Sequence, residues 1–428
     1  MKVRLDYDRE GLKVEVPDIN LAGILQLPDV KPVTDLEESL EMALLHPIGT
    51  KPLQELARGR KSVCIVISDP TRPMPTKLIL PTILKQLENA GISKGKITIL
   101  IATGLHRAPE RDELFEMLGR KIVNNYRIIN HNARDKELKF LGYTENKTPI
   151  FINSHYLNAE FKIVTGLIEP HFMAGYSGGR KGICPGISGL ETTKKTHSPD
   201  YLESPYAAAG ILKNNPFHQE ILEIAKKAGA DFLINLILNR EREITGIFAG
   251  DLEKTWLKGV KELEKVVKIA VGKPADIVIT SGGGYPLDTT FYQSIKGMVT
   301  AMNIVKDKGT VIIASNCKGG IGNREFENLL RKTKDRGEFL AKIKQPHFFI
   351  IDQWQIEEMC KVLRKAEIMF YSDNLNNEIL RELMVAPIDS VEEGIQKALK
   401  KHGKSAKIIV IPQGPYVIPV LQNNYIAT

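Results

Sequence analysis

Continuous apolar runs alternate with amphipathic segments along most of the first half of the chain. Residues 62–68, 96–105 and 161–168 are apolar runs typical of buried strands. Segments 77–91 and 108–120 have apolar residues at helical spacing, and the second begins with proline and acidic residues and ends near glycine. Buried strands that alternate with helices predict a mostly parallel sheet covered on both faces.

The N-terminal region follows another pattern. Two short alternating runs, residues 3–7 and 12–16, predict a hairpin, and residues 33–47 predict a helix. Residues 214–239 predict a helical region, which is followed by a predicted hairpin around residues 241–250.

The second half repeats the strand–helix alternation. Residues 275–280 and 310–315 predict strands, each followed by a glycine-rich loop, with a helix over 289–305 between them. Residues 408–421 predict a late strand and a tail that can pack back on either domain.

We therefore expect an α/β fold with two domains, residues 1–270 and 271–428, each with a mostly parallel sheet flanked by helices. Any active-site cleft would lie between the two domains.

Composition supports a soluble globular protein. The 428 residues are too many for one core, and the 43% hydrophobic and 26% charged contents are ordinary. No apolar run approaches the roughly 18 residues needed to span a bilayer, and the N-terminus lacks an apolar signal core, so we expect a cytoplasmic protein with no membrane partner. The four cysteines show no paired spacing, which disfavours a disulfide framework or a zinc site.

The net charge of +8 raises the question of nucleic-acid binding. The lysines are spread along the chain, and no basic stripe with interleaved aromatic residues occurs. We therefore expect no nucleic-acid partner, and a mildly positive field would favour small anionic substrates.

Polar side chains follow three of the predicted strands in the first domain. Asp69 and Arg72 come after the first strand, His106 after the second, and His171 after residues 161–168. Ligands of open α/β sheets bind beyond the carboxyl ends of the strands. The sequence therefore predicts a site at this edge of the sheet.

A glycine-rich segment surrounds Arg180 and Lys181. Glycines allow a backbone to approach a ligand and to point N–H groups at an anion, and the two cations suit phosphate or carboxylate. The alternative is a surface loop with solvated basic residues; His171 and His197, which flank the segment, favour a functional site. His218 is interpreted as a capping or surface residue.

Two histidines on opposite sides of a substrate suit inversion of a stereocentre. His106 and His171 could each take a hydroxyl proton in one direction and return it in the other, while Arg72 grips a carboxylate. The hydrogen on the carbon of a 2-hydroxy acid is not acidic, so hydride removal and return is the reasonable route, and it requires an electron-accepting cofactor. Neither a Walker A ending nor a GxGxxG after a strand is present.

The predicted helix over 289–305 can present Tyr292, Gln293 and Lys296 on one face. A phenol, an amide and an ammonium group suit a small hydroxy-carboxylate; the alternative is a solvated helix face. Trp354, near the start of a later helix, is either core or the wall of a cleft.

The motifs SDPTRP (68–73), ATGLHR (102–107) and EPHFMAGYSGGRKG (169–182) resemble the nickel-dependent lactate racemase family. The resemblance implies nickel in a nickel pincer nucleotide, a pyridinium mononucleotide with two sulfur groups, covalently attached to Lys181 through a thioamide. It implies His197 as the nickel ligand and His106 and His171 as the acid–base residues.

The resemblance also implies the remaining contacts. Asp69 and Arg72 would orient the histidines and the substrate carboxylate. The cofactor contacts besides Lys181 would be Asp69, Ser177, Gly178 and Arg180. The substrate contacts besides Arg72 would be Tyr292, Gln293, Lys296 and Trp354. Residues 1–270 would bind the cofactor and carry the catalytic groups, and residues 271–428 would close over the substrate. Cofactor-synthesis enzymes would be partners in maturation.

The implied function is interconversion of D- and L-lactate by hydride abstraction and return through pyruvate. Three alternatives stay open: a racemase or epimerase of another 2-hydroxy acid or a sugar acid, an enzyme in which Lys181 forms a Schiff base with a keto acid, and an anion- or nucleotide-binding module without catalysis.

Overall fold

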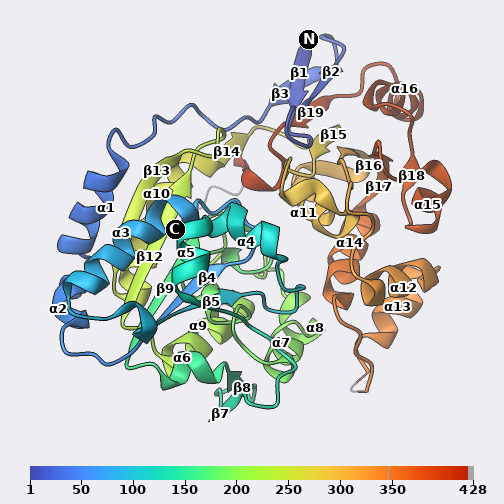
Figure 1. Cartoon of the computed structure of the whole chain (residues 1–428). Helices are drawn as coiled ribbons and strands as arrows, with labels where there is room; N and C mark the ends of the chain where they lie inside the picture. The colour runs from blue at the N-terminus through green and yellow to red at the C-terminus, as the bar shows by residue number, and fades with distance from the viewer. Residues whose placement is uncertain (346, 423–428) are drawn as a thin grey trace. The chain divides into compact units, whose positions relative to one another are not determined.

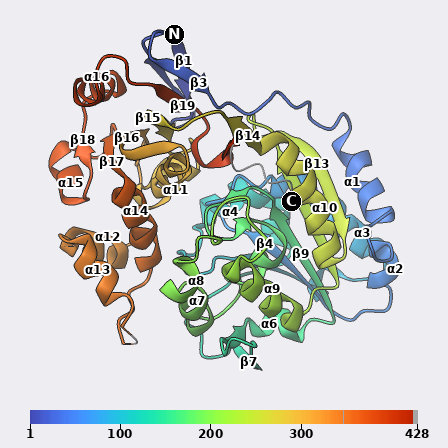
Figure 2. The ribbon, with the colours of Figure 1, turned by 180° about the vertical axis from the view of Figure 1, so that it is seen from behind.

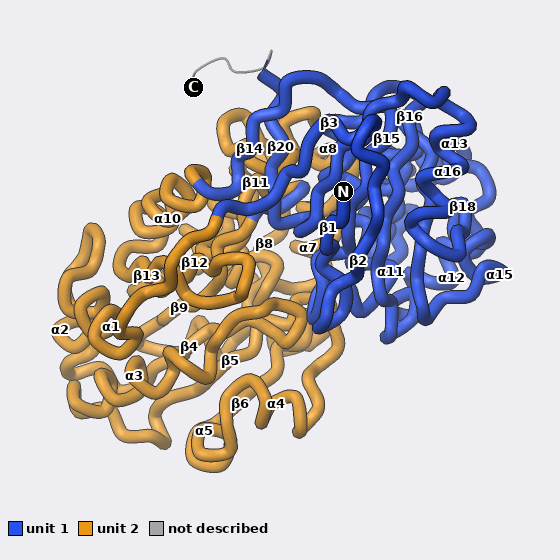
Figure 3. The backbone as a smooth tube through the Cα atoms, turned by 90° about the horizontal axis from the view of Figure 1, so that it is seen from above, with its two compact units in different colours: residues 1–28, 170–172, 266–428 blue, residues 29–169, 173–265 orange. Residues whose placement is uncertain are grey.

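The computed structural model describes residues 1–345 and 347–422, and these form two compact units. Unit 1 contains residues 1–28, 170–172 and 266–428, and unit 2 contains residues 29–169 and 173–265 (Figure 3). Both are built on a largely parallel sheet flanked by helices, so the predicted two-domain α/β fold is confirmed. In the described part of the chain, no helix has the length and apolar content needed to cross a bilayer.

The main sheet of unit 2 has six strands in the order β13-β12-β9-β4-β5-β6, and only the β12–β13 pair is antiparallel. The strands are β4 (Val63–Ser68), β5 (Ile97–Ala102), β6 (Arg127–Asn130), β9 (Phe161–Leu167), β12 (Phe232–Leu238) and β13 (Ile244–Gly250). The predicted strands and the hairpin near residue 241 are therefore confirmed. The prediction of a helical region through residue 239 is wrong at its end, because the helix ends at Ala228 and Phe232–Leu238 form a buried strand between β9 and β13.

Side chains of the strands alternate between two apolar layers, as the period of two requires. Val63, Ile65 and Ile67 of β4 point into a core with the helices of one face, whereas Cys64 and Val66 lie on the other. The first face is covered by α3 (Thr76–Asn89), α4 (Arg111–Leu118) and α5 (Arg120–Asn125), with α1 (Leu36–Leu45) and α2 (Leu53–Ala57) beside them (Figure 1). The helices α9 (Pro216–Ala228) and α10 (Leu252–Val267) lie on the other face (Figure 2).

Short elements complete unit 2. A hairpin of β7 (Lys139–Tyr143) and β8 (Pro149–Ile152) precedes α6 (Ser154–Asn158), and β11 (Gly175–Tyr176) leads into the 3₁₀ turn η2 (Gly179–Gly182). The turn η2 contacts β4, β9, β12 and α9, and the helices α7 (Leu190–Thr196) and α8 (Pro199–Leu202) follow it.

The main sheet of unit 1 is parallel throughout, in the order β18-β17-β16-β15-β19-β3. Its strands are β3 (Leu21–Ile24), β15 (Ala275–Ser281), β16 (Val305–Ala314), β17 (Ala366–Tyr371), β18 (Ala386–Pro387) and β19 (Ile408–Ile411), with a separate parallel pair of β14 (Lys268–Val271) and β20 (Ile418–Leu421). Strand β3, from the N-terminal region, extends this sheet by pairing with β19.

Helices cover both faces of this sheet. The hairpin of β1 (Lys2–Leu5) and β2 (Leu12–Glu15) and the helix α16 (Val391–His402) share a core with one face. The helices α11 (Phe291–Met302) and α14 (Gln353–Lys365) contact each other and the sheet. The remaining helices are α12 (Arg324–Lys332), α13 (Arg336–Lys342) and α15 (Asn377–Glu382).

Candidate functional site

The strand order of unit 2 reverses at β4. The chain proceeds from β4 outward through β5 to β6 and then returns to the other side of β4 as β9. The point where the order reverses is where ligands bind in open α/β sheets. Asp69 follows β4 directly, and His106 follows β5.

Asp69 and His106 form a hydrogen-bonded pair. The Asp69 Oδ2 atom lies 2.6 Å from His106 Nδ1, and Thr71 Oγ1 donates to Asp69 Oδ1 at 2.6 Å. Burial alone would raise the pKa of the Asp69 carboxyl, but His106, Arg72 and the Thr71 hydroxyl together hold it below its usual value. An ionised Asp69 fixes the hydrogen on Nδ1 and leaves Nε2 of His106 as the nitrogen that can accept a substrate proton.

Lys181 lies in η2, the turn that contacts β4 and β9. Its Nζ atom is 5.5 Å from the centre of the Phe217 ring. Burial, together with the charges of Arg72 and Arg180, lowers the pKa of the Lys181 amine to about 7. The amine is therefore substantially neutral, and hence nucleophilic, near neutral pH.

His197 ends helix α7 and faces the same aromatic ring. Its ring meets the Phe217 ring edge-to-face at 4.9 Å between centroids, and its Nδ1 lies 3.0 Å from the Thr193 carbonyl oxygen. Because a carbonyl can only accept, Nδ1 carries the hydrogen and Nε2 bears the lone pair. Burial, aided by the charge of Lys181, lowers the pKa of His197 to about 3. A neutral imidazole in a fixed tautomer is the form that binds a metal.

The predicted cofactor contacts in the glycine-rich segment are held by local bonds. The hydroxyl of Ser177 donates to the Leu167 carbonyl at 2.7 Å and accepts from the Glu169 N–H at 2.9 Å. Gly178 has a positive φ of 73°, and a Cβ there would lie 2.8 Å from Asn235 Oδ1. Arg180 is buried, and its Nη1 has no partner among the described residues, which leaves it available to an anionic group.

Three residues that contact this segment were not identified as functional from the sequence. Asn235 accepts from the Gly179 N–H at 2.9 Å, and Trp256 donates from Nε1 to the Ser177 carbonyl at 2.8 Å. The prediction of His218 as a capping or surface residue is wrong, because it is 8% exposed and accepts from Arg180 Nε at 3.0 Å. Nothing in the local pattern marks these side chains, since each reaches the turn from a distant element.

His171 lies in the segment 170–172, which belongs to unit 1, within β10 (Pro170–His171). It is buried, and its ring stacks on that of Phe172 at 5.0 Å. Its pairing with His106 as a second acid–base residue stays a prediction.

The predicted substrate contacts of unit 1 come together on α11 and α14. The Tyr292 hydroxyl donates to Asp352 Oδ1 at 3.0 Å and accepts from Trp354 Nε1 at 3.4 Å. Gln293 and Lys296 are both buried, so the alternative of a solvated helix face is wrong for them. The Oε1 atom of Gln293 has no partner among the described residues. Their roles toward a substrate stay predictions.

Other sequence features have structural explanations. His131 is buried between two hydrogen bonds, from Nε2 to the Ser188 carbonyl at 3.0 Å and from Asn153 Nδ2 to Nδ1 at 3.1 Å. The glycine-rich loop after β15 allows close packing, because a Cβ at Gly282 would lie 2.4 Å from Ser315 Oγ. All four cysteines are buried free thiols.

Comparison with known proteins gives matches over nearly the whole chain. The family model for the lactate racemase N-terminal domain matches residues 7–210, and that for the C-terminal domain matches residues 270–419. The lactate racemase of Thermoanaerobacterium thermosaccharolyticum is 35% identical over 421 residues, covering 97% of this chain and 98% of that protein. The lactate racemase of Lactiplantibacillus plantarum is 35% identical over 424 residues, covering 97% and 99%.

Solved structures agree. The lactate racemase apoprotein from T. thermosaccharolyticum superposes with a TM-score of 0.91 at 34% identity, covering 98% of this chain and 100% of that one. A protein from Thermotoga maritima shares the fold, with a TM-score of 0.68 at 18% identity and coverage of 92% and 100%. With such identity over nearly its full length, this chain belongs to the lactate racemase family, a family of isomerases.

Proposed function

We propose that this protein is a lactate racemase that interconverts D- and L-lactate with a nickel pincer nucleotide attached to Lys181. The observation that carries the proposal is the arrangement around Phe217. A lysine amine with a pKa of about 7 and a neutral histidine in a fixed tautomer contact the same ring. Membership of the lactate racemase family supports the substrate.

The residues present fit such a group. Attachment through a thioamide requires a neutral amine, which the lowered pKa of Lys181 supplies. Imidazole nitrogen is a suitable nickel ligand beside soft donors, and His197 offers Nε2. Next to it, the buried hydroxyls of Thr193 and Ser198 have no partner among the described residues and could bond to polar atoms of a bound group. When bound, the cofactor would supply a hydride acceptor and donor.

The chain's own groups would bind lactate and move its hydroxyl proton. Arg72 would hold the carboxylate, and Asp69 would keep His106 in the tautomer whose Nε2 accepts the proton. His171 would accept the hydroxyl proton of the other enantiomer. Pyruvate would be the intermediate common to both directions. Tyr292, Gln293, Lys296 and Trp354 are proposed to contact the substrate.

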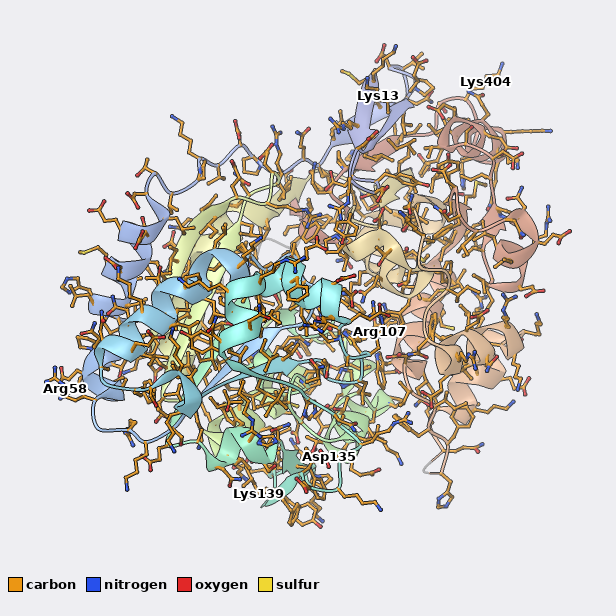
Figure 4. All side chains as sticks on the ribbon, viewed as in Figure 1. Lys13, Arg58, Arg107, Asp135, Lys139 and Lys404 are labelled. Carbon is orange, nitrogen blue, oxygen red and sulfur yellow. The ribbon has the colours of Figure 1, made fainter. Side chains whose placement is uncertain are left out.

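The test is to produce the protein together with the cofactor-synthesis enzymes that we propose as its maturation partners. Intact mass, nickel content and conversion of single enantiomers of lactate would be measured for the parent, Lys181→Ala and a matched control, Lys139→Ala. Lys139 is an exposed lysine of the same unit (Figure 4). Added mass, nickel and racemisation in the parent and control, but not in Lys181→Ala, are expected. Racemisation by Lys181→Ala, or a parent without added mass, would refute the proposal.

A second candidate is an enzyme in which Lys181 forms a Schiff base, because a lowered amine pKa is also what that chemistry requires. Borohydride would then trap pyruvate on Lys181 in protein without nickel. A panel of 2-hydroxy acids and sugar acids, tested on the nickel-loaded protein, would separate lactate from the other substrates of the same reaction.

A further inference from the structure

Arg180 is buried beside Lys181 in a stack of three side chains. Its Cζ atom lies 3.7 Å from the centre of the Trp256 ring, and the His218 ring lies 5.4 Å from the same ring. Arg180 Nε donates to His218 Nδ1 at 3.0 Å, and Nη2 donates to the Ala174 carbonyl at 2.8 Å. Two hydrogen bonds and one ring face therefore fix the orientation of the guanidinium group.

The acceptors of Arg180 are neutral groups. Since a guanidinium group stays protonated in proteins, Nδ1 of His218 must accept, so that imidazole is the neutral tautomer with its hydrogen on Nε2. Burial and the charge of Arg180 agree with this by lowering the pKa of His218 to about 3. His218 is itself held in place because its backbone N–H donates to the Asn215 side chain that caps α9.

Trp256 also fixes the backbone on the other side of the turn. Its Nε1 donates to the Ser177 carbonyl at 2.8 Å, and its ring lies so close to Gly179 that a Cβ there would be 2.8 Å from Cγ. The turn itself closes when the Lys181 N–H donates to the Gly178 carbonyl at 3.0 Å. The backbone that precedes Lys181 is thus held at two places, by the hydrogen bond from Trp256 to the Ser177 carbonyl and by the hydrogen bonds of the Arg180 side chain.

We infer that His218 and Trp256 are positioning residues that act through Arg180 and the Ser177 carbonyl to aim the Lys181 side chain. The inference rests on the proposed attachment of a cofactor to Lys181. It concerns side chains of α9 and α10, which would affect how Lys181 is presented without contacting substrate. A displacement on the order of 1 Å at a reacting group can cost a hundredfold in rate.

The test compares His218→Leu, which removes the acceptor, with His218→Asn, whose Oδ1 can occupy the place of Nδ1 and accept from Arg180. Trp256→Phe keeps the ring and removes the indole N–H. The control is His46→Leu, at an exposed histidine of the same unit. For each variant, the fraction of chains with added mass after co-production, kcat and KM per loaded chain, thermal unfolding, and hydrogen exchange of residues 177–182 in the apoprotein are measured.

We expect His218→Leu to lower the loaded fraction or kcat by about tenfold or more with little change in KM, and to speed exchange of the turn. In His218→Asn, the loaded fraction and kcat should lie within about threefold of the parent values, because the hydrogen bond to Arg180 is restored. Trp256→Phe should speed exchange at the turn.

The inference is overturned if His218→Leu loads, turns over and exchanges like the parent. It is also overturned if the loaded fraction and kcat decrease equally in His218→Leu and His218→Asn, in proportion to the decrease in their unfolding temperatures. That result would show that His218 contributes to stability alone. A parent that carries no added mass would refute the proposed function, yet exchange of residues 177–182 would still decide whether the stack holds the turn.

Discussion

The amine of Lys181 should react as a nucleophile at a pH where ordinary lysines do not. An unperturbed lysine has a pKa of about 10.4, so at pH 7 only about 0.04% of it is neutral. With a pKa of about 7, half of the Lys181 amine is neutral at that pH. The structure therefore predicts an advantage of roughly 1,000-fold in neutral amine at pH 7.

The perturbation that tests the cause is Arg72→Met. Burial makes the largest contribution to the lowered pKa of Lys181, and the charge of Arg72 comes next. Removing one neighbouring cation while keeping a long apolar side chain should raise the pKa of Lys181, so the midpoint of its reactivity moves to higher pH.

The assay is competitive labelling of the apoprotein with a trace of acetic anhydride between about pH 5 and about pH 10, read by peptide mass spectrometry. Lys13 and Lys404 serve as references because both are exposed and point away from the ribbon (Figure 4). The expected midpoint for Lys181 is near pH 7, and higher in Arg72→Met. The reasoning fails if the profile of Lys181 runs parallel to those of the references, or if Arg72→Met leaves it unchanged.

Three further predictions concern stability and substrate binding. Burial lowers the pKa of His131 to about 4, below the 6.5 of an unfolded chain, so the unfolded state binds more protons between these values and stability is lost as the pH falls from about 6.5 to about 4. The loss in the free energy of unfolding is about 2 kcal/mol at pH 5. In urea unfolding, the decrease in this free energy from pH 8 to pH 5 should be about 2 kcal/mol smaller in His131→Asn than in the parent, and equal decreases would contradict the prediction. In Asp352→Asn the bond from Tyr292 loses its charged acceptor, so KM for lactate should rise about fivefold with kcat retained, and an unchanged KM would count against the substrate role. A Cβ at Gly297 would lie 2.2 Å from the Ser281 carbonyl oxygen, so Gly297→Ala should destabilise the protein by about 2 kcal/mol or more, and an unaltered unfolding temperature would disprove the close packing.

The sequence determined most of the secondary structure, because long apolar runs can be satisfied only as strands buried on both faces. It also determined that Asp69 and His106 share one edge of a sheet, since parallel neighbouring strands end on the same side. The family was indicated by three short motifs. None of these inferences needed knowledge of which distant segments pair.

Only the tertiary structure decided the rest. Strand β3 joins the sheet of unit 1 by pairing with β19, although its local pattern fits many partners. Lys181 and His197 contact the ring of Phe217, and Trp256 and His218 reach Arg180, across separations in sequence that no periodicity encodes. The physical reason is that local patterns report which face of an element is buried, whereas partners across the core are chosen by how side chains of several elements fit together.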